Sequence, residues 1–180
     1  MDTLPDYLGP DLKLVVIGLN PSPASIRAGY YYGHPRNRFW PAMRAAGLAP
    51  ADFEPGPQAL AWLRDHRSIG FTDIVKRPTP GGGDLRAADY RRWAPVLHDH
   101  LQRMRPRVAW FNGKGVYEQY VRHGLGERKQ AVALGRQDRV LAATTVVFVT
   151  PNPSPANAAF DFATLVAWYR QVAATAGIAG

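Results

Sequence analysis

The chain has 180 residues, a length typical of a single domain, and its apolar and charged fractions are those of a soluble globular protein. It contains no cysteine, which excludes disulfides, thiolate zinc sites, iron–sulfur clusters and a cysteine nucleophile. The net charge is +8 and most of the positive charge is arginine, which favours a nucleic-acid partner, although a soluble protein can be basic without one.

Other classes of protein are also disfavoured by the sequence. The five histidines do not form a convincing set of metal ligands, so we expect no metal site. No apolar stretch has the length of a membrane span, and the N-terminus lacks the apolar region of a signal peptide. We therefore expect a cytoplasmic, nucleoid-associated protein, or a nuclear one in a eukaryote.

Apolar, β-branched segments alternate with segments of helical periodicity along the chain. Strands are predicted at 12–19, 68–72, 107–111 and 144–149, and helices at 37–46, 58–65, 86–104, 115–123 and 160–174. Such alternation is typical of an α/β protein with a parallel sheet. The prediction is a single three-layer α/β/α domain over residues 1–180, with a short, mostly parallel central sheet of about four strands and helices on both faces.

An identical pentapeptide, Asn-Pro-Ser-Pro-Ala, occurs at 20–24 and at 152–156, and each copy directly follows a predicted strand. Proline fixes its own φ and restricts the preceding residue, so each copy should form a stiff loop. Because ligands of open α/β sheets bind beyond the carboxyl ends of the strands, we predict that the two loops form two sides of one site. The alternative is that Asn-Pro and Ser-Pro are turn dipeptides that recur by chance.

The first loop places Asn20 at the mouth of this site, after Gly18 and Leu19 at the strand end. A carboxamide is not a strong base, but it can hold a water molecule by donating and accepting hydrogen bonds. A reaction whose transition state is mostly leaving-group departure would suit such a group. The alternative is a structural role, which is common for asparagine in turns. Glycine-rich dinucleotide and phosphate-loop motifs are absent, so no nucleotide cofactor is expected.

A long aromatic loop at 26–38 contains three consecutive tyrosines, at positions 30–32, close to glycines. A tyrosine at the tip of such a loop can offer its ring face to a planar heterocycle, and stacking of this kind contributes about 1–3 kcal/mol per base. The alternative is that some of these rings belong to the core. Phe39 and Trp40, at the start of the following helix, are expected there.

Polar residues also follow the second and third predicted strands. Asp73 is the one carboxylate predicted at the carboxyl edge of the sheet beside the first loop, where it could orient or deprotonate a water. The alternative is a helix cap or a salt bridge with Lys76 or Arg77. Lys114 begins a predicted helix after a glycine, which indicates a phosphate site or else a solvated turn. The segment 76–84 has the composition of a mobile surface loop.

These segments together resemble the mismatch-specific uracil/thymine DNA glycosylases of the uracil-DNA glycosylase superfamily, over residues 14–169. The resemblance depends on several motifs in the family's order rather than on any one of them. The matching segments are Gly-Leu-Asn-Pro at 18–21, His-Pro-Arg-Asn-Arg-Phe-Trp at 34–40, Ile-Gly-Phe-Thr-Asp-Ile-Val-Lys-Arg-Pro-Thr at 69–79, Phe-Asn-Gly-Lys-Gly-Val-Tyr-Glu at 111–118 and Pro-Asn-Pro-Ser at 151–154.

The resemblance implies roles for individual residues. Asn20 would position the water that attacks C1′, and Tyr32 would stack on the extruded base. The expected residues of the base pocket are Gly18, Leu19, Ser25, Tyr32 and Asn152. The expected DNA-binding residues are Lys114 and an insertion loop of Ser154, Pro155, Ala156 and Asn157, which would enter the minor groove as the nucleotide flips.

The chain also departs from its relatives. The faster, uracil-specific branch of the superfamily has an aspartate and a histidine where Asn20 and Asn152 stand here, which implies slower chemistry and a more permissive pocket. Ala156 stands where relatives place a larger wedge, such as leucine or arginine, so tight plugging of the stack and strong guanine readout are in doubt. Asp73 stands where relatives often lack a carboxylate. We hypothesise that Asp73 assists Asn20 as a water-activating base.

The sequence therefore predicts a monofunctional, monomeric DNA glycosylase of base-excision repair that needs no cofactor. Its expected partner is double-stranded DNA that contains uracil, best opposite guanine, with thymine and other damaged bases less certain. A mismatched base costs the least to extrude, which supplies part of this selectivity. Two alternatives stay open: a protein that binds lesions without cutting, and an enzyme that acts on free nucleosides or nucleotides.

Overall fold

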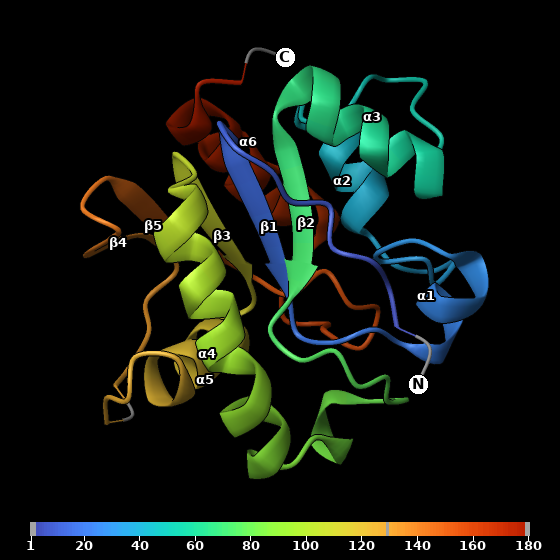
Figure 1. Cartoon of the computed structure of the whole chain (residues 1–180). Helices are drawn as coiled ribbons and strands as arrows, with labels where there is room; N and C mark the ends of the chain where they lie inside the picture. Colours follow the sequence, from blue (N-terminus) through green and yellow to red (C-terminus); the bar gives the residue numbers. More distant parts are fainter. Residues whose placement is uncertain (1–2, 129, 179–180) are drawn as a thin grey trace.

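A five-stranded sheet forms the centre of the computed structural model, which describes residues 3–128 and 130–178 (Figure 1). The strand order is β2-β1-β3-β5-β4; the first four are parallel and β4 is antiparallel to β5. The strands are β1 (Leu14–Gly18), β2 (Ile69–Asp73), β3 (Val108–Asn112), β4 (Gly135–Leu141) and β5 (Thr145–Thr150). The helices are α1 (Pro23–Ala28), α2 (Phe39–Ala45), α3 (Pro57–Arg67), the 3-10 turn η1 (Gly82–Asp84), α4 (Ala87–Met104), α5 (Lys114–His123) and α6 (Phe162–Ala176).

Helices cover both faces of the sheet because successive side chains of its parallel strands point to opposite sides. Val16 and Trp110 belong to one buried cluster, which includes residues of α2, α3 and α6. Val15 and Phe111 belong to a second cluster, which includes residues of α4 and α5. Strands buried on both faces explain the continuous apolar runs in the sequence. The predicted three-layer arrangement with a mostly parallel sheet is therefore confirmed.

Besides the 3-10 turn η1, two elements were not predicted from the sequence. The edge strand β4 carries polar residues such as Arg136 and Asp138 and has no apolar run, because it pairs with β5 on one side only. Helix α1 begins inside the first pentapeptide, where Ser22 caps it and Pro23 occupies its first turn. The two pentapeptides are thus not equivalent, since the second continues into a turn at 154–157 and not into a helix.

The strand register places polar residues together at one edge of the sheet. Gly18 at the end of β1 is aligned with Asp73 at the end of β2, and Asn112 on β3 is aligned with Thr150 on β5. The arrowheads of β1 and β2 point to this edge in Figure 1. The carboxyl edge is therefore where a ligand of this fold would bind.

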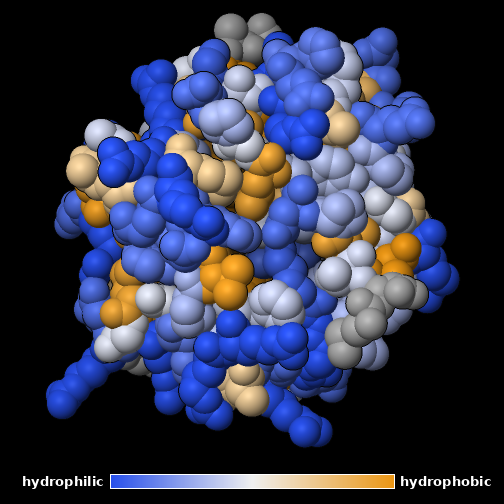
Figure 2. Space-filling view, viewed as in Figure 1, coloured by the Kyte–Doolittle hydropathy of each residue, from blue (hydrophilic) through white to orange (hydrophobic). Residues whose placement is uncertain are grey.

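The face of the molecule seen in Figure 2 is largely hydrophilic, and its hydrophobic side chains lie in small separate groups. This face offers no broad apolar surface of the kind that buries a permanent partner. Among the described residues, no helix is long and apolar enough to cross a membrane.

Candidate active site

A cavity of about 190 Å³ lies at the carboxyl edge of the sheet. Both pentapeptide loops line it, together with the ends of β1, β2 and β3 and the aromatic loop. Of the residues proposed from the sequence, the cavity brings together Gly18, Leu19, Asn20, Ser25, Tyr32, Asp73, Asn152 and Ser154. Pro155, Ala156, Asn157 and Lys114 do not line it. We call this cavity the base pocket, after the role that the sequence leads us to expect for it.

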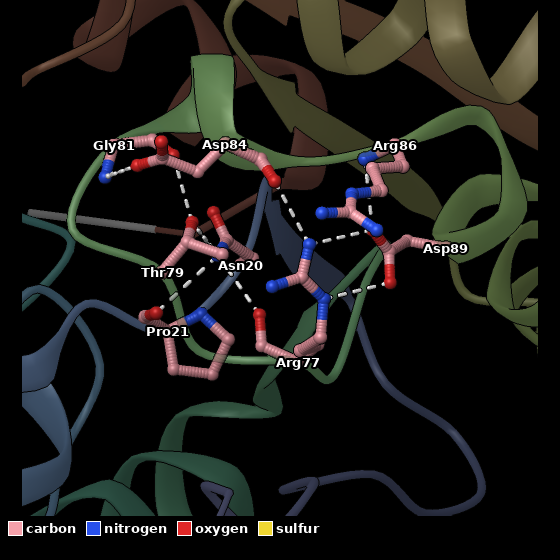
Figure 3. Close-up of polar contacts among 8 residues, drawn as sticks. All are labelled: Asn20, Pro21, Arg77, Thr79, Gly81, Asp84, Arg86 and Asp89. Carbon is pink, nitrogen blue, oxygen red and sulfur yellow. Dashed lines mark hydrogen bonds and ion pairs between the residues drawn. The ribbon is translucent and has the colours of Figure 1, made fainter.

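The side-chain amide of Asn20 has one fixed orientation (Figure 3). Its Nδ2 donates to the carbonyl of Arg77 at 2.9 Å and to Oγ1 of Thr79 at 2.7 Å, while that hydroxyl donates to the carbonyl of Gly81 at 2.7 Å. Both hydrogens of the amide are directed at these acceptors. If the amide were flipped, its Oδ1 would face the carbonyl oxygen of Arg77, and neither atom could donate a hydrogen bond. Oδ1 is therefore presented as an acceptor, which suits a water molecule that must keep a lone pair for attack.

The segment 76–84, predicted to be a mobile surface loop, is exposed at residues 80–84, and its residues 79–82 also form a wall of the base pocket. Thr79 is buried and its backbone N–H donates to the carbonyl of Pro21 at 3.2 Å. Arg77 makes a bidentate pair with Asp89 on α4, at 2.8 Å for each bond, and also donates to the carbonyl of Asp84 (Figure 3). Glycine and proline composition indicated a loop, but these long-range contacts fix it against Asn20.

Asp73 is a buried carboxyl group, only 5% exposed, at the edge of the pocket. Burial raises its pKa to about 7; nearby Lys76 lowers the pKa and nearby Asp6 raises it, each by less than the burial does. The alternative in which Asp73 forms a salt bridge is wrong, because Lys76 pairs with Asp6 and Arg77 pairs with Asp89. No residue in the described part of the chain donates a hydrogen bond to this carboxyl group, so it is available to a bound water.

The carboxyl group of Asp73 can occupy its position because Gly18 has no side chain. A Cβ atom at residue 18 would lie 2.3 Å from Oδ1 of Asp73 and 3.1 Å from the hydroxyl of Tyr32. Real atoms do not approach so closely, and the carboxyl group is the end of a side chain that can rotate away. The backbone at this position is not left-handed, so alanine itself is compatible with the strand.

We therefore expect Gly18→Ala to fold and to lose activity. The displaced Asp73 should reduce the single-turnover rate of base release about as much as removal of its charge, by roughly 10²–10⁴-fold. Gly115→Ala is the matched control, because nothing lies within 4 Å of a Cβ atom there. Thermal denaturation should show both variants folded; a fully active Gly18→Ala would contradict this view of the site.

Tyr32 lies in the pocket with one ring face already covered. Its ring stacks on Phe39, with centroids 3.8 Å apart and an interplanar angle of 16°, so only the opposite face is left for a base. Its backbone has a left-handed φ of 58°. The nearby Ser25 accepts hydrogen bonds from the N–H of Gly33 and the hydroxyl of Ser22, both at 3.1 Å, which fixes the middle of the aromatic loop to the start of α1.

Asn112 is a pocket residue whose position at the site was not recognised from the sequence. Its Oδ1 accepts from the hydroxyls of Thr150 at 3.1 Å and Tyr169 at 3.4 Å, and its Nδ2 donates to the hydroxyl of Tyr32 at 3.3 Å. Thr150 in turn accepts from the indole of Trp110 at 2.8 Å, so its proton is committed to Asn112. The amide is thereby held with its NH₂ group toward the pocket. Its position as the last residue of a buried strand was the signal available.

Arg38 fixes the second pentapeptide loop to the aromatic loop. Its guanidinium donates to the backbone carbonyls of Asn157 and Phe160, and its own N–H donates to the carbonyl of Pro153 at 3.3 Å. Within the loop, Asn152 accepts from the N–H of Ser154 at 2.8 Å and also receives the amide of Asn157 on its carbonyl at 2.9 Å. The predicted insertion loop is thus a pre-formed turn.

Other predicted positions stay outside this arrangement. Lys114 is exposed at the first turn of α5 and does not contact the pocket. Within residues 3–128 and 130–178, no group of three or more histidine, cysteine, aspartate or glutamate side chains is placed to hold a metal ion.

Comparison with known proteins agrees with this architecture. The model of the uracil DNA glycosylase superfamily matches residues 5–173. A similar fold occurs in the solution NMR structure of a "putative Uracil DNA glycosylase" from Methanosarcina acetivorans, with a TM-score of 0.59 and 24% identity over 94% of this chain and 96% of that one. The family match covers nearly the whole chain, and its bounds enclose every residue of the base pocket except Leu4. The chain therefore belongs to the uracil DNA glycosylase superfamily, whose members act on DNA.

Proposed function

We propose that this protein is a monofunctional DNA glycosylase that hydrolyses the N-glycosidic bond of a flipped uracil in duplex DNA. Uracil opposite guanine is the preferred substrate, and thymine or other damaged bases are slower ones. The observation that carries the proposal is a pocket in which a buried carboxyl group, Asp73, and an acceptor amide, Asn20, face the same small volume. The net charge of +8 supports sequence-independent affinity for the phosphates of DNA.

The two polar groups divide the work of hydrolysis. As the bond from C1′ to the base nitrogen breaks, its electron pair leaves with the base and the sugar becomes oxocarbenium-like. Oδ1 of Asn20 accepts a hydrogen bond from the water that bonds to C1′, and ionised Asp73 takes the proton that this water loses. A carboxyl group with a pKa of about 7 is well suited, because it is ionised in a large fraction of molecules near neutral pH and is still basic enough to accept the proton.

Asn112 supports selection of bases with a keto group. Because Thr150 and Tyr169 occupy its oxygen, Asn112 can offer only its NH₂ group to a base. A carbonyl oxygen, as in uracil, accepts from this group, whereas the exocyclic amine of cytosine would leave two donors facing each other. A buried donor without an acceptor costs about 1–3 kcal/mol, which is enough to discriminate between the two bases.

Asn112→Asp tests this selection. Aspartate can still accept from Thr150 and Tyr169, so the fold should persist, but it offers no donor to the base. We expect uracil release to slow by roughly 10–100-fold, which corresponds to about 1.4–2.7 kcal/mol, and cytosine release to increase, because an aspartate oxygen can accept from the exocyclic amine. The single-turnover rates of both bases measure this, and an unchanged uracil rate would exclude Asn112 from base recognition.

A substrate panel tests the proposed function as a whole. Under single-turnover conditions, we expect release from G·U duplex to be fastest, followed by A·U duplex and then G·T duplex. Free deoxyuridine should not react, because the charged surface and the flipping step both require DNA. Reaction of free deoxyuridine at a comparable rate would indicate a nucleoside hydrolase instead. Tight binding of G·U duplex without any release would indicate a lesion-binding protein.

A further inference from the structure

A second cavity, of about 470 Å³, lies beside the base pocket. Its lining comes from the aromatic loop (His34, Arg36 and Asn37) and from the insertion loop (Ser154, Pro155 and Ala156), together with Ser22 and Pro80. Five of these residues also line the base pocket, so the two cavities adjoin: Ser22, His34, Asn37, Pro80 and Ser154. A nucleotide flipped into the base pocket would leave its position in the helix close to this cleft.

The tip of the second pentapeptide loop cannot fill the place of a missing base. Pro155 and Ala156 are exposed at this tip, and the side chain of Ala156 is one methyl group. An extruded base leaves a gap in the stack as wide as a heterocycle, and without a replacement the base would return to it. The loop is also held in its turn by the bonds from Arg38, which limits how far it can reach.

Arg36 of the aromatic loop lines the same cleft as Ala156. Its side chain is exposed, and its guanidinium makes no hydrogen bond or ion pair with any residue that the structure describes. Arg38, two residues later, is instead committed to the carbonyls of Asn157 and Phe160. The contacts of Arg38 therefore fix the segment that carries Arg36 against the insertion loop and leave Arg36 directed to solvent beside Ala156.

We infer that Arg36 enters the space vacated by the flipped nucleotide, and so supplies the wedge that Ala156 lacks. This inference rests on the proposed function. A guanidinium is planar, stacks on aromatic faces and carries five donors for the acceptors of neighbouring bases, so it can replace a base in the stack. Arg36 acts as a positioning residue, because it holds the flipped state and does not touch the reacting atoms.

Comparison of duplex with single-stranded DNA tests this role. A single strand has no vacated stack, so Arg36→Ala should slow uracil release from G·U duplex by at least tenfold while release from single-stranded DNA changes by less than twofold. The double variant Arg36→Ala/Ala156→Leu, which carries an apolar wedge on the insertion loop instead, should recover most of the duplex rate. Arg91→Ala, at an exposed arginine of α4, is the matched control and should change neither rate.

Equal slowing on duplex and single-stranded DNA would show that Arg36 binds phosphate only, and would overturn the inference. A second readout is independent of base release: 2-aminopurine next to the uracil brightens when the base is extruded and stacking is lost. Wild type should produce this signal on G·U duplex and Arg36→Ala should not. If wild type flips the base without releasing it, the proposed function fails and the role of Arg36 is still decided.

Discussion

Replacement of Asp73 by asparagine is expected to slow single-turnover uracil release by roughly 10²–10⁴-fold, the range typical of a lost general base. Asparagine keeps the size of the side chain and removes its ability to take a proton. The buried carboxyl group makes no salt bridge or hydrogen bond within the described residues, so the substitution disturbs no visible structural contact. An unchanged rate would exclude Asp73 as the base.

The pH dependence of the same variant gives a second check. The pKa of Asp73 is about 7, so its reactive, ionised form should increase tenfold per pH unit below that value and level off above it. The wild-type rate should follow this curve, whereas the residual rate of Asp73→Asn should be flat between pH 5 and pH 8. A wild-type profile without an inflection near neutral pH would contradict the assignment.

As the pH rises, the stability of the wild-type protein should fall while its activity increases. Because the pKa is about 7 in the fold against 3.8 for the free group, the folded protein binds more protons than the unfolded chain between these values. Stability therefore falls as pH rises through this window, by up to about 4 kcal/mol. Asp73→Asn carries no such charge, so its advantage over wild type in urea denaturation should increase from about pH 4 to pH 7 and then stay constant. Such a cost is common at active sites.

Replacement of Asn20 by alanine has the second large expected effect, a loss of roughly 10²–10³-fold in the single-turnover rate of uracil release. Removal of other oriented hydrogen-bonding groups from active sites has effects of this size. The variant removes Oδ1 from the pocket and leaves the hydroxyl of Thr79 without the amide donor. Gln58→Ala, which removes an exposed side-chain amide on α3 outside the base pocket, is the matched control and should keep the wild-type rate. A loss below tenfold would mean that Asn20 does not hold the water.

The double variant Asn20→Ala/Asp73→Asn shows whether the two residues act on one water. If they do, the second substitution should add little to the first, because a water that is already misplaced gains nothing from a base. Multiplicative losses would instead indicate two separate roles, such as contact of Asn20 with the sugar or base.

Most of the fold could be predicted because its elements are locally encoded. The strand around Val16 is a continuous apolar, β-branched run and the helix around Leu97 has helical periodicity, so no distant contact is needed to recognise them. Strand β4 has no such pattern: Arg139 pairs with Glu127, and the strand is held mainly by pairing with β5. Helix α1 was missed because Ser22, which caps it, and Pro23, which begins it, were interpreted as part of a loop.

The residues of the candidate site that lie at the ends of strands could be predicted from the sequence. Gly18, Asp73 and Asn152 are found at the pocket because parallel strands end at one edge. The orientation of the amide of Asn20 was not predictable, since it depends on Thr79, a residue 59 positions away in the chain. Asn112 was likewise missed, because its direction depends on hydroxyl groups from β5 and α6.

The most direct test is single-turnover release of uracil from a G·U duplex by wild type, Asn20→Ala and Asp73→Asn, measured together with binding of the same duplex. We predict release by wild type, at least hundredfold slower release by each variant, and similar binding by all three proteins. Binding by wild type without release would contradict the assignment of this pocket as the site of glycosidic-bond hydrolysis.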